Sequence, residues 1–266
     1  MEKAGTVVLT GAAGGMGRAV RTLLEQKGYR VWALDITDAG GSGSIRTDIT
    51  DGKSVEAAFN EIASRSGHID AIVHTAGIYT MDSLVEMTDE EVLRIFNVNL
   101  FGIMRINRIF LPILNPHSRI TMVSSELAPL DPLPFTGIYA ITKSAIEKYA
   151  YSLRMELQLL GHTVSVIRPG AVRTPFLDQS QKKIEAFCNK TALYGDTSRR
   201  FLNLVDRIET ANVEPERIAR KVLKALEARH PRYVYNINRS PLLRLMSALP
   251  QHMQNRVIAR VLRNGK

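Results

Sequence analysis

Short runs of apolar residues recur along the chain, and longer stretches with helical spacing separate them. The runs are nearly continuous rather than alternating, which is typical of strands that are buried on both faces of a parallel sheet. Five such strands are predicted, at 6–10, 30–34, 69–73, 119–123 and 163–167. Two weaker strands are predicted at 44–46 and 233–237.

The stretches between the strands carry the helical patterns. Helices are predicted near 15–28, 51–66, 88–114 and 138–160. Strands that alternate with helices indicate an α/β fold with right-handed crossovers and helices on both faces of the sheet. The sequence contains no internal repeat, low-complexity tract or linker. It therefore predicts a single Rossmann-like, doubly wound domain over residues 1–266.

The composition excludes several classes of protein. Hydrophobic residues make up 45% of the 266 positions, which is enough for a substantial core. No run approaches the roughly 18 consecutive apolar residues of a spanning helix, and the first residues lack the apolar segment of a signal peptide. We therefore expect a cytoplasmic protein. Cys188 is the only cysteine, so the chain forms no internal disulfide, and no metal site is predicted.

The net charge of +9 is unevenly distributed along the chain. Residues 217–266 contain twelve Lys or Arg and one acidic residue, Glu227, which gives this segment a charge of +11 and leaves the rest at −2. This asymmetry argues against a nucleic-acid-binding body. It confines any anionic partner to the C-terminal segment.

A glycine-rich turn follows the first predicted strand and opens the first helix. It reads Thr-Gly-Ala-Ala-Gly-Gly-Met-Gly over residues 10–17. Glycines at such a turn let a pyrophosphate approach the helix N-terminus, where unpaired N–H groups and the helix dipole favour negative charge. By itself, the turn is equally compatible with a purely structural connection.

Asp35 ends the second predicted strand, eighteen residues after Gly17. A carboxylate in this place accepts hydrogen bonds from both hydroxyls of an adenosine ribose and repels a 2′-phosphate. No Lys or Arg interrupts the glycine-rich turn or directly follows Asp35, so the sequence favours NAD over NADP. The alternative is that Asp35 only begins the turn over 36–38.

Tyr139 and Lys143 stand four residues apart at the start of a long predicted helix, so their side chains lie on one face. A free tyrosine has a pKa near 10 and needs a neighbouring cation to lose its proton at neutral pH. An ammonium and an oxidised nicotinamide ring beside it make a phenol useful as a general acid/base. Ser125 ends a buried strand, where open α/β sheets bind their ligands. Each feature also has an ordinary structural explanation, because such pairs occur in many helices and serines often form turns.

Together, the glycine-rich turn and the Tyr-x-x-x-Lys helix resemble the short-chain dehydrogenase/reductase family over roughly residues 5–176. The resemblance implies that Tyr139 is the general acid/base and that Lys143 stabilises the phenolate and holds the nicotinamide ribose. It implies that Ser125 hydrogen-bonds the substrate oxygen and that Asn99 holds a water in the proton relay. The alternative for Asn99 is that it caps a helix break.

The same resemblance implies a set of cofactor contacts. Asp48 and Ile49 correspond to the pair that contacts adenine, and the loop over 168–175 corresponds to the one that holds the carboxamide and phosphates. The predicted cofactor-binding residues are Gly11, Gly14, Gly15, Met16, Gly17, Asp35, Ile36, Asp48, Ile49, Ala76, Gly77, Tyr139, Lys143, Pro169, Gly170, Val172 and Thr174.

The chain departs from the family pattern in two places. The family's Asn-Asn-Ala-Gly after the fourth strand is replaced by His-Thr-Ala-Gly over 74–77, which puts the anchoring of that strand in doubt. His74 itself is interpreted as a hydrogen-bonded structural residue. The glycines at 11, 14 and 17 also fit the extended, epimerase-like branch, but only about 90 residues follow Pro175. That is too short for the larger substrate domain of that branch, so the shorter branch is favoured.

Residues 176–211 match the family's substrate lid in position and show no sharp period. Apolar residues in the lid, and between the catalytic serine and tyrosine, either form a pocket for a bulky alcohol or ketone or pack the lid onto the body. They are Leu127, Leu130, Leu133, Pro134, Phe135, Phe176, Leu177, Phe187, Leu193, Tyr194, Phe201 and Leu202. The chain also loosely resembles the hydroxysteroid- and retinol-type dehydrogenases, while sugar alcohols and acyl thioesters stay open as substrates.

The sequence thus predicts an NAD-dependent oxidoreductase that interconverts a secondary alcohol and a ketone. Two alternatives stay open: an NADP-dependent ketoreductase of the same family, and a non-catalytic NAD-binding regulator. The helices near 88–114 and 138–160 carry apolar residues on more than one face, and related enzymes bury such faces in a two-fold helix bundle. A homodimer or homotetramer is therefore expected.

Two basic helices are predicted over about 240–264, the first opened by Ser240-Pro241 and the second by Pro250. Apolar residues recur in them at spacings of three and four, with arginines beside them. One interpretation is that these stripes dock on the body or on a neighbouring subunit. The other is weak contact with an anionic membrane surface.

Overall fold

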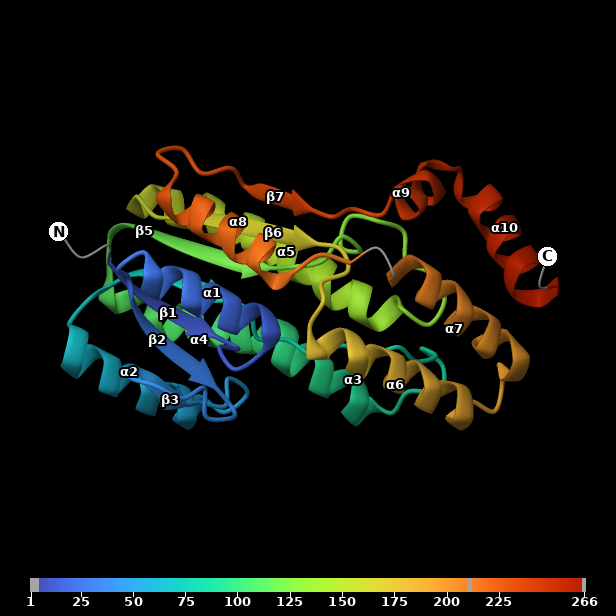
Figure 1. Ribbon diagram of the computed structural model, residues 1–266, viewed down its shortest axis with the longest axis horizontal. Helices are drawn as coiled ribbons and strands as arrows, with labels where there is room; N and C mark the ends of the chain where they lie inside the picture. The colour runs from blue at the N-terminus through green and yellow to red at the C-terminus, as the bar shows by residue number, and fades with distance from the viewer. Residues whose placement is uncertain (1–4, 210–211, 265–266) are drawn as a thin grey trace.

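The computed structural model describes residues 5–209 and 212–264, and a wholly parallel seven-stranded sheet forms its centre (Figure 1). The strand order is β3-β2-β1-β4-β5-β6-β7. The strands are β1 (Thr6–Thr10), β2 (Arg30–Asp35), β3 (Ser44–Arg46), β4 (Ile69–His74), β5 (Leu114–Val123), β6 (Thr163–Pro169) and β7 (Val234–Ile237). All seven predicted strands are present. The fifth begins five residues earlier than its apolar run indicates.

The described helices include the four predicted stretches and the two predicted basic helices near the C-terminus, together with α6, α7 and α8, which the sequence pattern did not reveal. They are α1 (Gly15–Gln26), α2 (Gly52–Ser66), α3 (Asp89–Phe96), α4 (Gly102–Phe110), α5 (Gly137–Leu157), α6 (Pro175–Lys190), α7 (Gly195–Glu209), α8 (Pro215–Glu227), α9 (Pro241–Ala248) and α10 (Gln251–Asn264). The single helix expected over 88–114 is divided by a π-helical turn, Asn97–Phe101, between α3 and α4. The expected lid over 176–211 forms α6 and α7, and its last two positions lie outside the described residues.

Helices cover both faces of the sheet because alternate residues of each buried strand point to opposite sides. Val7 and Leu9 of β1 pack in one apolar cluster with residues of α1 and α8. Val8, between them, packs in a second cluster with Trp32 and with residues of α2, α4 and α5. The doubly wound architecture predicted from the near-continuous apolar strands is therefore confirmed.

Three of the helices, α2, α3 and α9, begin with a side-chain cap that the structure shows. The Asp51 carboxylate accepts a hydrogen bond from the Lys53 N–H at the start of α2. Thr88 and Glu91 form a reciprocal capping box at the start of α3. In α1, by contrast, the N-cap is Gly14, which has no side chain to accept from the first N–H groups. The first turn of α1 therefore keeps donors for a ligand.

A third apolar cluster joins the lid helices to the body around Phe135. Its ring lies 4.8 Å from that of Phe187, 5.0 Å from that of Tyr194 and 5.3 Å from that of Phe201, between ring centroids. These four aromatic residues thus pack α6 and α7 onto the body, which is the second of the two interpretations given for them. Leu193 is exposed. The side chains of Phe176 and Leu177 lie outside the described residues.

The C-terminal helices extend the molecule beyond the sheet. In Figure 1, α9 and α10 lie at the end opposite the N-terminus, next to α7. Within the described ranges, no helix combines the length and apolar character needed to cross a bilayer. The same residues contain no group of three or more side chains that could hold a metal ion.

Candidate active site

The order of the strands creates a crevice at one edge of the sheet. The chain proceeds outward from β1 in both directions, to β2 on one side and to β4 on the other. The loops after β1 and β4 therefore diverge at a topological switch point, where open α/β sheets bind their ligands. A cavity of about 980 Å³ lies there. Its lining includes every predicted catalytic and cofactor-binding residue except Asn99.

The glycine-rich turn has no room for a side chain at Gly11 or at Gly17. Gly11 adopts a φ of +72°, and a Cβ on it would lie 2.4 Å from the backbone nitrogen of Ala76 in the loop after β4. A Cβ on Gly17 would lie 2.0 Å from the carbonyl oxygen of Gly11. These contacts hold the start of α1 against the end of β1. The uncapped N–H groups of α1 and this open turn fit a pyrophosphate.

Carboxylates flank the cavity on the side of β2 and β3. One oxygen of Asp35 accepts a hydrogen bond from the Ala13 N–H at 2.9 Å, and the other accepts from the backbone and hydroxyl of Thr37, both at 3.0 Å. The side chain therefore both begins the local turn and faces the glycine-rich loop. Asp48 accepts from Thr50 in the same manner. Asp35, Asp48 and Ile49 line one end of the cavity and fit an adenosine.

Thr75 resolves the doubt about strand anchoring. Its backbone N–H and its hydroxyl both donate to the carbonyl oxygen of Thr10, at 3.0 and 2.7 Å, so the loop after β4 is tied to the end of β1. His74 is almost fully buried behind the cavity, and its Nε2 lies 2.8 Å from the Asn107 side-chain oxygen. Burial lowers the pKa of His74 from 6.5 to about 4, which keeps the imidazole neutral.

Lys143 and Tyr139 lie together in the cavity wall. The Lys143 ammonium is 5.5 Å from the centroid of the Tyr139 ring and donates to the carbonyl oxygen of Val123 at 3.2 Å. Burial lowers the pKa of Lys143 from 10.5 to about 8, so the charged form still predominates at neutral pH. The ring of Tyr79 packs edge-on against that of Tyr139, with centroids 4.7 Å apart.

The structure distinguishes the two serines at the end of β5. The Ser124 hydroxyl donates to Glu147 at 2.8 Å and is turned toward α5. Glu147 is itself paired with Arg168. The Ser125 oxygen accepts from the Leu127 N–H at 3.2 Å, which leaves its proton available to a ligand. Ser125 is therefore the better donor to a substrate oxygen, which agrees with the role that the family resemblance implies for it.

Asn99 lies in the π-helical turn behind the cavity rather than in its lining. It is fully buried, and its amide exchanges hydrogen bonds with both backbone groups of Ile78, at 2.8 and 2.9 Å. It also donates to the hydroxyl of Thr142 at 3.1 Å. The extra residue of the π-turn thus brings a polar side chain from the helix layer to the loop after β4.

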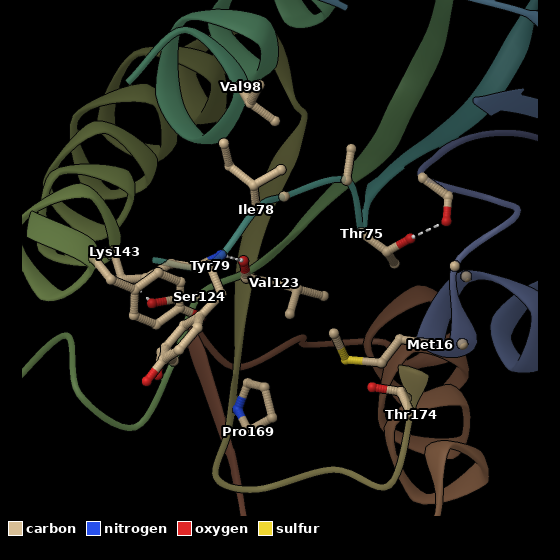
Figure 2. Close-up of a pocket in the computed structure, with 18 of the residues that line it drawn as sticks. Met16, Thr75, Ile78, Tyr79, Val98, Val123, Ser124, Lys143, Pro169 and Thr174 are labelled. Carbon is tan, nitrogen blue, oxygen red and sulfur yellow. Dashed lines mark hydrogen bonds between the residues drawn. The ribbon is translucent and has the colours of Figure 1, made fainter. Parts of the chain in front are cut away.

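The end of the cavity away from Asp35 and Asp48 is called the substrate end here. It is lined partly by side chains that the sequence did not indicate. Met81, Val205 and Leu243 come from a loop, from α7 and from α9, and they lie beside the predicted Leu127 and Leu133. Nothing near them in the sequence marks them as pocket residues. Figure 2 shows Tyr79, Ser124 and Lys143 together on one side of the cavity, and Met16 and Thr174 on the other.

Glu126 is a further unexpected member of this lining. Its side chain is buried, and one of its oxygens accepts from the Ser240 N–H at 2.6 Å. Burial raises the pKa of Glu126. The contact ties the start of α9 to the residue that follows Ser125, so the C-terminal segment is part of the substrate end of the cavity.

Comparison with known proteins agrees with this geometry. A model of the short chain dehydrogenase family matches residues 5–185. A 3-ketodihydrosphingosine reductase of Bacteroides thetaiotaomicron is 25% identical over 93% of this chain and 94% of its own. Human retinol dehydrogenase 5 is 29% identical over 86% of this chain and 79% of its own.

Solved structures share the fold. The ligand-free aldohexose dehydrogenase of Thermoplasma acidophilum superposes with a TM-score of 0.74 at 22% identity, over 92% of this chain and 96% of its own. The 3-ketoacyl-(acyl-carrier-protein) reductase of Brucella melitensis, complexed with NADH, gives 0.72 at 20% identity, over 89% and 98%. The chain is therefore a member of the short chain dehydrogenase family, an oxidoreductase with a Rossmann-like fold for a nicotinamide cofactor.

Proposed function

We propose that this protein interconverts a secondary alcohol and a ketone with NAD, with Tyr139, Lys143 and Ser125 as its catalytic residues. The observation that carries the proposal is that all three line the same cavity as the glycine-rich turn. A dinucleotide that begins at this turn has its reactive end within reach of the tyrosine.

The cofactor supplies the hydride acceptor, and the protein supplies position and the proton path. In the oxidative direction, Ser125 donates a hydrogen bond to the alcohol oxygen, and Tyr139 accepts the hydroxyl proton. The substrate carbon loses a hydride as its bond to oxygen becomes a carbonyl. The Lys143 ammonium favours the phenolate and would hold a ribose hydroxyl of the bound cofactor. Asn99 fixes the loop at Ile78. By resemblance to the family, it would also hold a water in the proton relay to the lysine.

The substrate is proposed to be lipophilic, such as a hydroxysteroid or another bulky alcohol. The substrate end of the cavity is lined by Met81, Leu133, Val205 and Leu243, which favour apolar groups. The names of two relatives, retinol dehydrogenase 5 and 3-ketodihydrosphingosine reductase, support the same class of substrate. Turnover assays with steroid, retinoid, fatty and sugar alcohols, followed by the absorbance of NADH, test this proposal. Sugar alcohols as the only substrates would contradict it.

NAD is proposed as the cofactor because Asp35 faces the glycine-rich turn. A carboxylate in this position pairs with ribose hydroxyls and repels a 2′-phosphate. Titration of the unmodified protein with both cofactors tests the proposal. A tenfold or larger preference for NADP would instead favour the ketoreductase alternative.

We also propose that the protein is a cytoplasmic homo-oligomer. Several large apolar side chains on α4 and α5 are exposed in the single chain. They are Met104 of α4 and Ile141, Tyr151 and Met155 of α5. Related two-fold assemblies bury such helix faces. Light scattering over a range of concentrations tests this, and a monomer at every concentration would contradict it.

Tyr139→Phe tests the mechanism, because it removes the exchangeable proton while nearly preserving the shape of the side chain. Turnover should fall at least about 100-fold, the usual cost of losing a general acid/base. NAD binding, measured by fluorescence, should persist. Tyr29→Phe is the matched control, since Tyr29 lies between α1 and β2, outside the cavity lining, and the variant should leave turnover unchanged.

Near-normal turnover of the Tyr139→Phe protein would contradict the mechanism. The non-catalytic alternative makes a different prediction: the unmodified protein would bind NAD and would produce NADH from none of the alcohol classes tested.

A further inference from the structure

The helix α10 has two neighbouring rows of residues spaced by four, of which only one packs on the body. Gln254, Ile258 and Leu262, spaced by four, form the inner row, and Leu262 belongs to the apolar cluster that joins the lid to the body. The Gln254 amide donates to Asp131 at 2.8 Å, and Arg200 of α7 donates to the Leu262 carbonyl at 3.0 Å. These contacts fix the orientation of the helix.

The second row consists of Met253, Val257 and Val261, each one position before a residue of the inner row. It is therefore rotated from that row by about 100° and faces solvent. The neighbouring α9 adds two more exposed leucines. The C-terminal strip is defined here as these five residues, whose exposed fractions are 47% for Leu242, 65% for Leu245, 42% for Met253, 39% for Val257 and 37% for Val261.

The charges that α9 and α10 themselves carry over their described residues are all positive. The side chains of Arg244, Arg256, Arg260 and Arg263 are exposed, and none of them forms an ion pair with a described carboxylate. The sequence contains no Asp or Glu after Glu227. Asp131 of the body is a carboxylate that contacts α10, through the hydrogen bond that it accepts from Gln254. An apolar strip on two helices whose own charges are all positive is complementary to a surface that combines phosphate groups with hydrocarbon.

A second copy of this chain is a poorer occupant for the same strip. Two-fold pairing through a self-complementary face would bring the arginines of one copy close to those of the other. Like charges brought together in this way oppose association. Charge complementarity thus favours an anionic lipid surface.

The strip is also close to the substrate end of the cavity. Leu243 lines the cavity and is buried, whereas Leu242 and Leu245 of the same helix turn face outward. The hydrogen bond from the Ser240 N–H to Glu126 attaches this turn to the loop after Ser125. A surface bound by α9 would therefore lie next to the wall through which an apolar substrate is recognised.

We propose that the C-terminal strip binds peripherally to the surface of an anionic phospholipid membrane. The five apolar side chains enter the boundary between headgroups and acyl chains, and the four arginines contact lipid phosphates. Binding is reversible and sensitive to salt, because each helix is short and the charges are exposed to solvent. The inference stands on the surface itself and does not require the proposed activity.

Sedimentation with vesicles tests the proposal on the full-length protein. The protein should pellet with phosphatidylcholine vesicles that contain phosphatidylglycerol and stay in the supernatant with phosphatidylcholine alone. Binding should be lost at high salt. Recovery in the supernatant with both kinds of vesicle at low salt would overturn the proposal.

Two double variants locate the binding surface. R256Q/R260Q should weaken the partition coefficient about thirtyfold, which corresponds to about 1 kcal/mol for each basic residue. M253S/V257S should weaken it about tenfold through lost apolar burial. Both pairs are exposed and outside the cavity lining, so thermal unfolding and NAD binding should stay unchanged.

Matched control variants remove the same number of exposed charges or exposed apolar side chains outside the C-terminal strip. K27Q/K53Q takes two exposed positive charges from the end of α1 and from α2, and L159S/L160S takes two exposed leucines from the 3-10 turn that follows α5. Neither control should change vesicle binding. Equal losses in control and test variants would overturn the proposal. So would a dimer in sedimentation velocity that M253S/V257S dissociates, since a second copy would then be the occupant.

Discussion

The two ends of the cavity are built in different ways. The cofactor end is made mainly of backbone: Gly11 touches the loop at Ala76, and Gly17 touches Gly11, at distances that exclude any side chain. The substrate end is made of apolar side chains from separate segments, such as Met81, Val205 and Leu243. A shared cofactor requires fixed backbone geometry, whereas a changing substrate is accommodated by exchangeable side chains. Substitutions at the cofactor end should therefore reduce NAD binding and stability, whereas substitutions at the substrate end should change only the turnover of the substrate.

The largest effect is expected from Gly17→Ala at the cofactor end. The new Cβ would lie 2.0 Å from the Gly11 carbonyl oxygen, so α1 or the turn must move. A displacement of this kind should weaken NAD binding by more than about 100-fold and reduce the free energy of unfolding by about 1–3 kcal/mol. Fluorescence titration and urea unfolding measure the two effects.

Gly52→Ala is the matched control for that substitution. Gly52 also lies at a helix start, but a Cβ there would meet nothing within 4 Å. NAD binding should be unchanged and stability equal or slightly higher. If Gly17→Ala, like Gly52→Ala, leaves NAD affinity and stability unchanged, then the close backbone contact at Gly17 does not determine cofactor binding.

Lowering the pH should reduce the free energy of unfolding through His74, whose imidazole is neutral in the folded protein. The pKa of His74 is about 4 in the folded protein and 6.5 when exposed, so the unfolded chain binds more protons between these values. Its contribution to stability is therefore complete above pH 6.5 and is lost as the pH falls toward 4. The loss should reach about 3 kcal/mol across this window.

Urea unfolding at a series of pH values measures this dependence. His74→Gln should flatten the change in the free energy of unfolding between pH 6.5 and 4, because the titrating group is absent. An unchanged slope in the variant would show that other groups, and not the buried imidazole behind the cofactor end, control the acid response.

A smaller effect, confined to the substrate end, is expected from Leu243→Ala. Loss of part of the apolar wall should lower kcat/KM for a bulky alcohol about tenfold, and NAD affinity should not change. Leu242→Ala, one residue earlier and outside the cavity lining, should leave both unchanged in an assay without vesicles. A fall in NAD affinity in the Leu243→Ala protein would contradict the prediction that the effect of this residue is confined to the substrate end.

The sequence by itself determined the parts that depend on short-range patterns. Near-continuous apolar runs predicted five of the strands because a strand buried on both faces has no polar side, and weaker patterns predicted the two outer strands β3 and β7. The glycine-rich turn, Asp35, and the pair Tyr139 and Lys143 were recognisable because each function needs residues at fixed local spacing. The resemblance to the family then added Asn99 and the loop over 168–175.

Only the tertiary structure decided the rest. The lid over 176–211 forms two helices that the sequence pattern did not show, because their inner faces are defined by Phe135 of a distant loop. The replacement of an asparagine by Thr75 was uninterpretable until its hydroxyl was found on the carbonyl of Thr10.

The C-terminal segment shows most clearly what helical periodicity in a sequence can and cannot predict. The periodicity of α9 and α10 predicted apolar stripes, and it left open whether they dock on the body or face a membrane. The structure assigns Leu243 and Leu262 to the body and leaves Leu242 and Val257 exposed. Spacing along a helix specifies which residues share a face, but contacts between segments far apart in the chain determine which face is buried.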